Sequence, residues 1–123
     1  MTQTENDAVL HGWVRSSFEA AGFARDVYRR GSGPGVIIVH EIPGITPKVA
    51  AFANDVVEAG FTVLMPSLVG EPGRAMSNGY ALQSMVQVCV AREFSTMALH
   101  QTSPIIGFLR ALKDRNWGAG KVL

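Results

Sequence analysis

Residues 40–44, which read His-Glu-Ile-Pro-Gly, are the segment of this sequence best suited to chemistry. They come directly after an apolar run at residues 36–39. In open α/β sheets, ligands bind beyond the carboxyl ends of the strands, so the charged residue Glu41 is better placed there for chemistry than for packing. The tight turn at Pro43 and Gly44 leaves nearby backbone N–H groups free to point into a cleft. Two such donors can stabilise the oxyanion of an acyl-transfer reaction. From the residues alone, Glu41 is equally a solvated loop residue or a site residue.

The two residues that could act as a nucleophile lack the sequence context that activates one. Cys89 is the only cysteine, and it lies between two valines without a glycine-rich turn. A free cysteine is commonly a small, buried apolar residue, so we expect Cys89 in the core. Ser67 follows the apolar run 61–65 without a Gly-x-Ser-x-Gly pattern, and we expect a turn residue.

The three histidines do not form a metal-binding pattern. They stand at positions 11, 40 and 100 without the spacing of metal ligands, so we expect neither a metal nor a cofactor. For His40, a structural role that closes the preceding strand is favoured over proton transfer.

The composition excludes several classes of function. A net charge of +1, from 11 Lys+Arg and 10 Asp+Glu, gives no basic surface for a nucleic acid. A single cysteine excludes an internal disulfide. The first seven residues are polar and give no signal peptide, and no apolar run is long enough to span a membrane. We therefore expect a cytoplasmic protein with a loose terminus over residues 1–7.

The elements that position residues 40–44 are predicted from hydrophobic periodicity. Residues 13–18 and 23–29 are expected to form an N-terminal hairpin that turns at residues 20–22. The run 36–39 does not alternate with polar residues, as in a parallel strand that is buried on both faces. A helix capped by Thr46 and ended by Gly60 follows, and then a second apolar strand at 61–65. These elements predict a central, parallel βαβ unit.

Two further helices are expected beyond an irregular segment at residues 66–79. The first covers residues 80–94 and places four apolar residues on one face. These are Leu82, Met85, Val86 and Cys89. The second begins at Ser103 and Pro104 and ends near Trp117. Residues 121–123 then read as the start of another strand.

Several of these segments resemble the dienelactone hydrolase family. Residues 33–44 look like its first core strand and oxyanion loop, and residues 59–68 look like its next strand and turn. Residues 89–94 and the helix after Pro104 also fit. The resemblance covers roughly residues 9–123. It implies an α/β class fold, a partial α/β-hydrolase with a central, mostly parallel sheet, flanking helices and the N-terminal hairpin.

The resemblance assigns a role to three residues. Glu41 matches the family glutamate that pairs with the nucleophile, and the backbone N–H of Ile42 matches one oxyanion-hole donor. Arg74 is a candidate for an arginine that contacts a substrate carboxylate. The family opens ester or lactone bonds with a Cys (sometimes Ser), His and Asp triad, whose nucleophile stands in a Gly-x-Cys-x-Gly-Gly turn. No such turn occurs in this sequence, so we expect residues 1–123 to be a single, incomplete domain.

Two functions of different classes are consistent with the sequence. The chain is either the N-terminal part of an ester or lactone hydrolase, or a non-catalytic binding or assembly module that pairs an open sheet edge with a partner. In both cases we expect self-association through the edge at residues 121–123 or by exchange of elements. The coding sequence downstream of Leu123 distinguishes the two, because a Gly-x-Cys-x-Gly turn there favours the hydrolase.

Overall fold

The first two strands form an antiparallel hairpin, as the sequence predicts. In the computed structural model, which describes residues 3–90 and 104–115, β1 covers Val14–Ala20 and β2 covers Phe23–Gly31. The strands pair in register, with Ala20 opposite Phe23. The two residues between them have positive φ angles, 55° at Ala21 and 88° at Gly22. A two-residue turn of this kind matches the twist of the strands it joins.

The predicted βαβ unit is present and supplies the strand that precedes residues 40–44. β3 covers Gly35–Ile37, α2 covers Pro47–Glu58 and β4 covers Thr62–Pro66. β3 and β4 are parallel and hydrogen-bonded to each other. Thr46 caps α2 by accepting a hydrogen bond from the N–H of Val49, so the helix begins where the sequence indicates.

The directions of the strands differ from the prediction of a mostly parallel sheet. The order is β1-β2-β4-β3, and only the pair β3–β4 is parallel. The hairpin causes the difference, because β2 runs antiparallel to β4 along the side away from β3. In the part of the chain that the structure describes, β4 is therefore an inner strand and β3 an edge strand.

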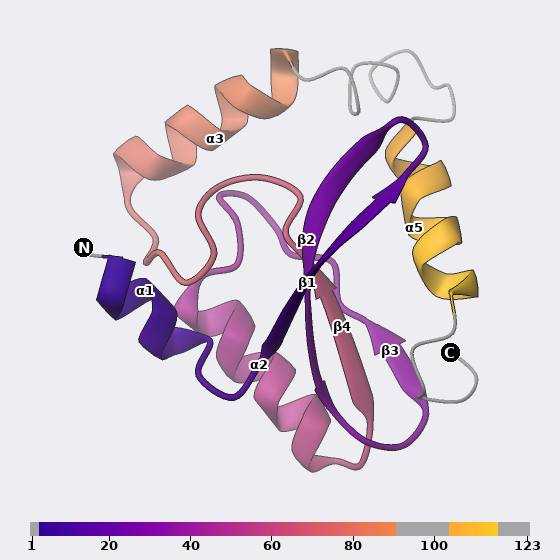
Figure 1. Ribbon diagram of the computed structural model, residues 1–123. Coiled ribbons are helices and arrows are strands. Elements are labelled where there is room, and N and C mark those ends of the chain that lie inside the picture. Colours follow the sequence, from indigo (N-terminus) through magenta and orange to yellow (C-terminus); the bar gives the residue numbers. More distant parts are fainter. Residues whose placement is uncertain (1–2, 91–103, 116–123) are drawn as a thin grey trace.

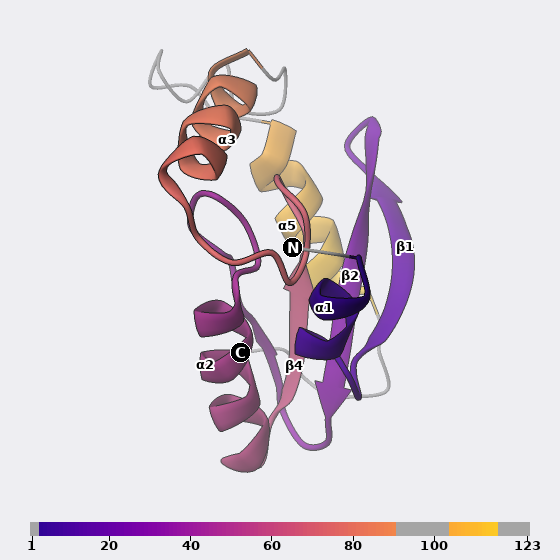
Figure 2. The same ribbon diagram turned by 90° about the vertical axis from the view of Figure 1, so that its left-hand side faces the viewer.

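Helices cover both faces of this sheet (Figures 1 and 2). Val63 and Met65 of β4 pack toward α2, whereas Leu64 between them packs toward α5, which covers Pro104–Asp114. Phe108 of α5 is fully buried and meets the ring of Phe18 edge-on, with centroids 5.4 Å apart. Both faces of β4 are thus in a core, which explains why its residues do not alternate with polar ones.

The prediction of a loose terminus over residues 1–7 is wrong for residues 3–7. Residues Gln3–Val9 form α1, which lies on the same side of the sheet as α2. The two residues that follow it in the core, Leu10 and Trp13, join the cluster beneath α2, and Asn6 is buried. The sequence did not indicate this helix because its own residues are mostly polar. The apolar residues that anchor it, Leu10 and Trp13, come after it in the sequence.

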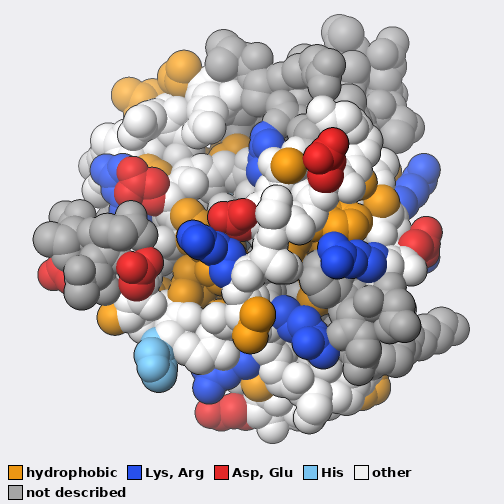
Figure 3. Space-filling view, viewed as in Figure 1, with side chains coloured by type: hydrophobic (Ala, Val, Ile, Leu, Met, Phe, Trp, Pro, Cys, Tyr) orange, Lys and Arg blue, Asp and Glu red, His pale blue; other side chains and the backbone are white. Residues whose placement is uncertain are grey.

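The helix α3, Asn78–Val90, turns its apolar side outward. Leu82, Met85 and Val86 share one face, as the sequence predicts, but they are 65%, 52% and 55% exposed. Figure 3 shows apolar side chains on the outer side of this helix. The inner side carries Tyr80 and Ser84, which are both buried. The side chain of Cys89 and the strand expected at residues 121–123 lie outside the described residues.

The opposite environments of two leucines give a test of this arrangement. Leu64→Ala should lower the free energy of unfolding by about 2–5 kcal/mol, because it leaves a cavity between two packed layers. Leu82→Ala should change it by less than about 0.5 kcal/mol, as expected for an exposed position. Urea unfolding of the two variants measures both values. An equal loss for both leucines would contradict the outward orientation of Leu82.

Candidate active-site turn

The segment 40–45, here called the turn, leaves the carboxyl end of β3 and leads into α2. Glu41 is exposed, and its carboxylate has no hydrogen bond or ion pair to any described residue. Ile42 is half-buried, and its backbone N–H has no hydrogen-bond acceptor among the described residues. Both predicted residues lie beyond the carboxyl end of β3, which is the end of the strands where ligands bind in such folds.

His40 joins the turn to the segment that follows β4. The side chain is buried, and its Nε2 atom accepts hydrogen bonds from the N–H of Leu68 at 2.9 Å and from the N–H of Val69 at 3.4 Å. Its Nδ1 atom lies 2.8 Å from the carbonyl oxygen of Glu41. Backbone amides only donate and carbonyls only accept, so the bonds assign a neutral ring with the proton on Nδ1. The structural role expected for His40 agrees with this geometry.

Burial also lowers the pKa of His40 from its ordinary value, and the bond to the Glu41 carbonyl only partly opposes this effect. A second proton would have to sit on Nε2, where it would face the N–H groups of Leu68 and Val69. His40 is thus suited to holding the turn rather than to exchanging protons near neutral pH.

The rest of the turn is held by α3 and by the segment 67–73. Ser84 Oγ donates to the carbonyl oxygen of Pro43 at 3.0 Å, and the N–H of Gly73 donates to the carbonyl oxygen of Ile45 at 2.7 Å. A side chain at Gly44 would collide with Tyr80, because an added Cβ would lie 2.8 Å from its hydroxyl oxygen. The carbonyl oxygen of Val69 would also lie 2.8 Å from this Cβ, so glycine is required here by the close approach of both α3 and the segment 67–73.

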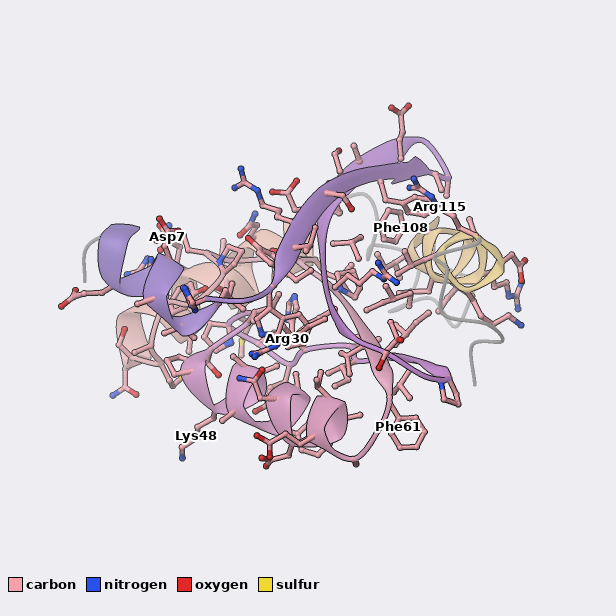
Figure 4. The ribbon with its side chains drawn as sticks, turned by 60° about the horizontal axis from the view of Figure 1, so that its bottom comes forward. Asp7, Arg30, Lys48, Phe61, Phe108 and Arg115 are labelled. Carbon is pink, nitrogen blue, oxygen red and sulfur yellow. The ribbon has the colours of Figure 1, made fainter. Side chains whose placement is uncertain are left out.

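A cavity of about 310 Å³ opens beside the turn. It is lined by residues 38–41, which follow β3, and by Lys48, Val49 and Phe52 from the first turns of α2. Lys48 extends from α2 away from the body of the molecule (Figure 4). The cavity therefore presents one acidic group and one basic group above an apolar wall. Within residues 3–90 and 104–115, no group of three His, Cys, Asp or Glu residues is arranged to hold a metal ion.

Arg74 lies apart from this cavity. Its guanidinium group stacks on the ring of Tyr80 at 4.2 Å from the centroid and lies 3.5 Å from a carboxylate oxygen of Glu71. Arg74 is not among the residues that line the cavity. The hydroxyl of Tyr80 accepts from the N–H of Glu71 at 2.7 Å, so Arg74 and Tyr80 both brace the segment that supports the turn.

A larger cavity of about 500 Å³ lies between the hairpin and the segment after β4. Its lining includes Arg25, Ser67 and Gln87, and no residue of the turn contributes to it. Arg25 donates to the carbonyl oxygens of Leu68 and Ala24, which fixes it as part of the wall. The smaller cavity is the better candidate for a site because Glu41 opens into it.

Comparison with known proteins gives the family of the chain. The sequence model described as "Dienelactone hydrolase family" matches residues 22–104, which include the turn and all of the βαβ unit. The chain belongs to the dienelactone hydrolase family. No curated protein matches it.

The structural neighbours have the α/β-hydrolase fold of this family. The crystal structure of an epoxide hydrolase from Vigna radiata superposes with a TM-score of 0.52 at 17% identity, and the match covers 100% of this chain and 30% of that one. A mutant Vigna radiata epoxide hydrolase gives a TM-score of 0.40 at 15% identity, over 67% of this chain and 29% of the other. The chain thus spans less than a third of the length of these structures.

Sequence reasoning missed the two α3 residues that hold the turn. Tyr80 and Ser84 are four residues apart, so they share a helix face, and both are polar. That spacing could have indicated their role, because a polar pair opposite the apolar face of a helix suggests that the polar pair forms buried hydrogen bonds. The matching carbonyl groups lie 41 and 9 positions away in the sequence, which no local pattern reveals.

The lowered pKa of His40 predicts how the stability of the chain depends on pH. In the window between the folded pKa of His40 and its unfolded value near 6.5, the unfolded state binds more protons, so stability rises with pH. The contribution is complete above the unfolded pKa and is lost as the pH falls below it. Unfolding in urea should show a larger loss between about pH 7.5 and about pH 5.5 for the natural chain than for His40→Gln.

A variant that leaves the imidazole and its partners in place provides the control for this measurement. Leu82→Ala, at an exposed position, should keep the pH dependence of the natural chain, because His40 and its hydrogen bonds are unchanged. Equal slopes for the natural chain and for His40→Gln would contradict the hydrogen bonding assigned to the buried imidazole.

Proposed function

We propose that this chain is the N-terminal part of a hydrolase of carboxylic esters or lactones and supplies one half of its oxyanion hole. One observation carries the proposal. The N–H of Ile42 has no acceptor within the described residues, while the carbonyl groups of Glu41 and Pro43 on either side are both bonded. A donor left unpaired in a turn that is otherwise held in place is suited to bind a developing negative charge.

The roles of the residues in this proposal follow from acyl-transfer chemistry. The Ile42 N–H donates to the oxyanion of the tetrahedral intermediate, and Glu41 pairs with the nucleophile in the resting enzyme, as the family resemblance implies. The second oxyanion donor is the N–H of the residue after the nucleophile. Arg74 is not included, because its guanidinium group is stacked on Tyr80 outside the cavity. A cytoplasmic location is part of the proposal, since the single cysteine forms no internal disulfide.

An alternative function, a binding or assembly module, is supported by two other observations. β3 ends the sheet, so the outer edge of its backbone has no strand beside it among the described residues. The apolar face of α3 formed by Leu82, Met85 and Val86 is exposed. Under this alternative the open edge pairs with a partner, which includes a second copy of the chain.

A complementation experiment tests the hydrolase. The chain alone should give no burst and no turnover with p-nitrophenyl acetate, because none of its residues stands in a Gly-x-Cys-x-Gly turn. Mixed with the C-terminal part of a dienelactone hydrolase that carries this turn, it should form a complex in native mass spectrometry and hydrolyse the ester. Glu41→Ala should lower the rate of that complex. Glu58→Ala, an exposed carboxylate at the far end of α2, should leave the rate unchanged.

Two outcomes would count against the hydrolase. A complex that forms and has no activity would favour the assembly module, and so would dimers of the chain alone that exclude the added part. A burst from the chain alone that disappears in Cys89→Ala would instead contradict the roles assigned to the residues, because Cys89 would then be the nucleophile.

A further inference from the structure

The hydrogen bond between His40 and Glu41 acts on the same peptide group that carries the Ile42 N–H. The carbonyl oxygen of Glu41 and the N–H of Ile42 belong to one peptide unit, and that unit is trans. A trans peptide is planar, with its C=O and N–H pointing in opposite directions. A donor that holds the Glu41 oxygen therefore also sets the direction of the Ile42 N–H.

We propose that His40 is a positioning residue for the oxyanion donor, and that its Nδ1–H bond to the Glu41 carbonyl fixes the plane of the 41–42 peptide. The importance of this plane for catalysis rests on the proposed function, whereas the positioning itself does not. With the carbonyl turned toward the buried imidazole, the N–H points away from it. Rotation of this peptide would exchange the two groups and offer a carbonyl oxygen where the oxyanion needs a donor.

The imidazole can fix the peptide because the imidazole is itself fixed. Its Nε2 atom accepts from the N–H of Leu68 and the N–H of Val69, in the segment that continues β4. Rotating the ring would leave those two amides without their acceptor in a buried place, which is costly. The direction of the Ile42 N–H is thus fixed relative to β4, the inner strand of the described sheet, rather than relative to the edge strand β3.

Two substitutions separate the two bonds of this ring. The amide oxygen of glutamine takes the place of Nε2, so His40→Gln keeps an acceptor for Leu68 and removes the donor to Glu41. The amide nitrogen of asparagine takes the place of Nδ1, so His40→Asn keeps the donor to Glu41 and removes the acceptor. A role in packing alone predicts the same result for both variants.

The direction of the Ile42 N–H can be measured by NMR as a one-bond residual dipolar coupling in the aligned, ¹⁵N-labelled chain. His40→Gln should change the Ile42 coupling by far more than it changes the couplings of the β4 amides. His40→Asn should keep the Ile42 coupling of the natural chain. His11→Gln is the matched control at an exposed position and should leave all couplings unchanged. Ser84→Ala, which removes the bond to the Pro43 carbonyl, should also leave the Ile42 coupling unchanged.

An unchanged Ile42 coupling in His40→Gln would overturn the proposal. If His40→Gln does not fold, His40→Asn decides, since a shifted Ile42 coupling in that folded variant would overturn it equally. Failure of the proposed function gives a different pattern, in which the couplings behave as expected and the complemented enzyme is as active with His40→Gln as with the natural chain.

Discussion

The hydrogen bond from the Leu68 N–H to the buried imidazole of His40 links the ends of two parallel strands where the candidate site lies. β3 has only three residues and lies at the edge of the described sheet, so its pairing with β4 cannot by itself hold the segment beyond its end. The imidazole extends the link between the strands past the last ladder bond. The turn can therefore keep one conformation although Glu41 within it is exposed.

The same requirement explains the unusual orientation of α3. A helix of a globular protein ordinarily buries its apolar face, and α3 instead turns Tyr80 and Ser84 inward. Both side chains meet backbone groups, the former at Glu71 and the latter at Pro43, so α3 holds both the turn and the segment that supports it. Buried backbone carbonyls need donors, and these two residues supply the turn and its support with them. The cost of this arrangement is an exposed apolar face formed by Leu82, Met85 and Val86.

The sequence predicted those parts of the fold that depend on local patterns. The cap at Thr46, the hairpin turn at Gly22 and the two apolar strands of the βαβ unit are local, and all are present. Periodicity identifies residues that share a helix face, but it does not say which way the face points, and so the orientation of α3 was missed. The antiparallel pairing of β2 with β4 joins segments far apart in the sequence, which is why the sheet was expected to be mostly parallel.

The candidate site was predictable to the same extent. Glu41 and Ile42 follow a strand directly, and their position at its carboxyl end follows from the sequence alone. The contacts that shape the turn come from residues 67–84 and depend on the folded chain. Arg74 was selected by resemblance, and its stacking on Tyr80 could only be seen in three dimensions.

The protonation state of the His40 ring is the most direct test, because the three hydrogen bonds assigned to this ring depend on it. Imidazole ¹⁵N chemical shifts of the labelled chain at neutral pH distinguish the two neutral tautomers and the cation. The hydrogen bonds of His40 predict a protonated Nδ1 atom and an unprotonated Nε2 atom. A proton on Nε2, in the other tautomer or in the cation, would contradict it, since the N–H groups of Leu68 and Val69 would then have no acceptor.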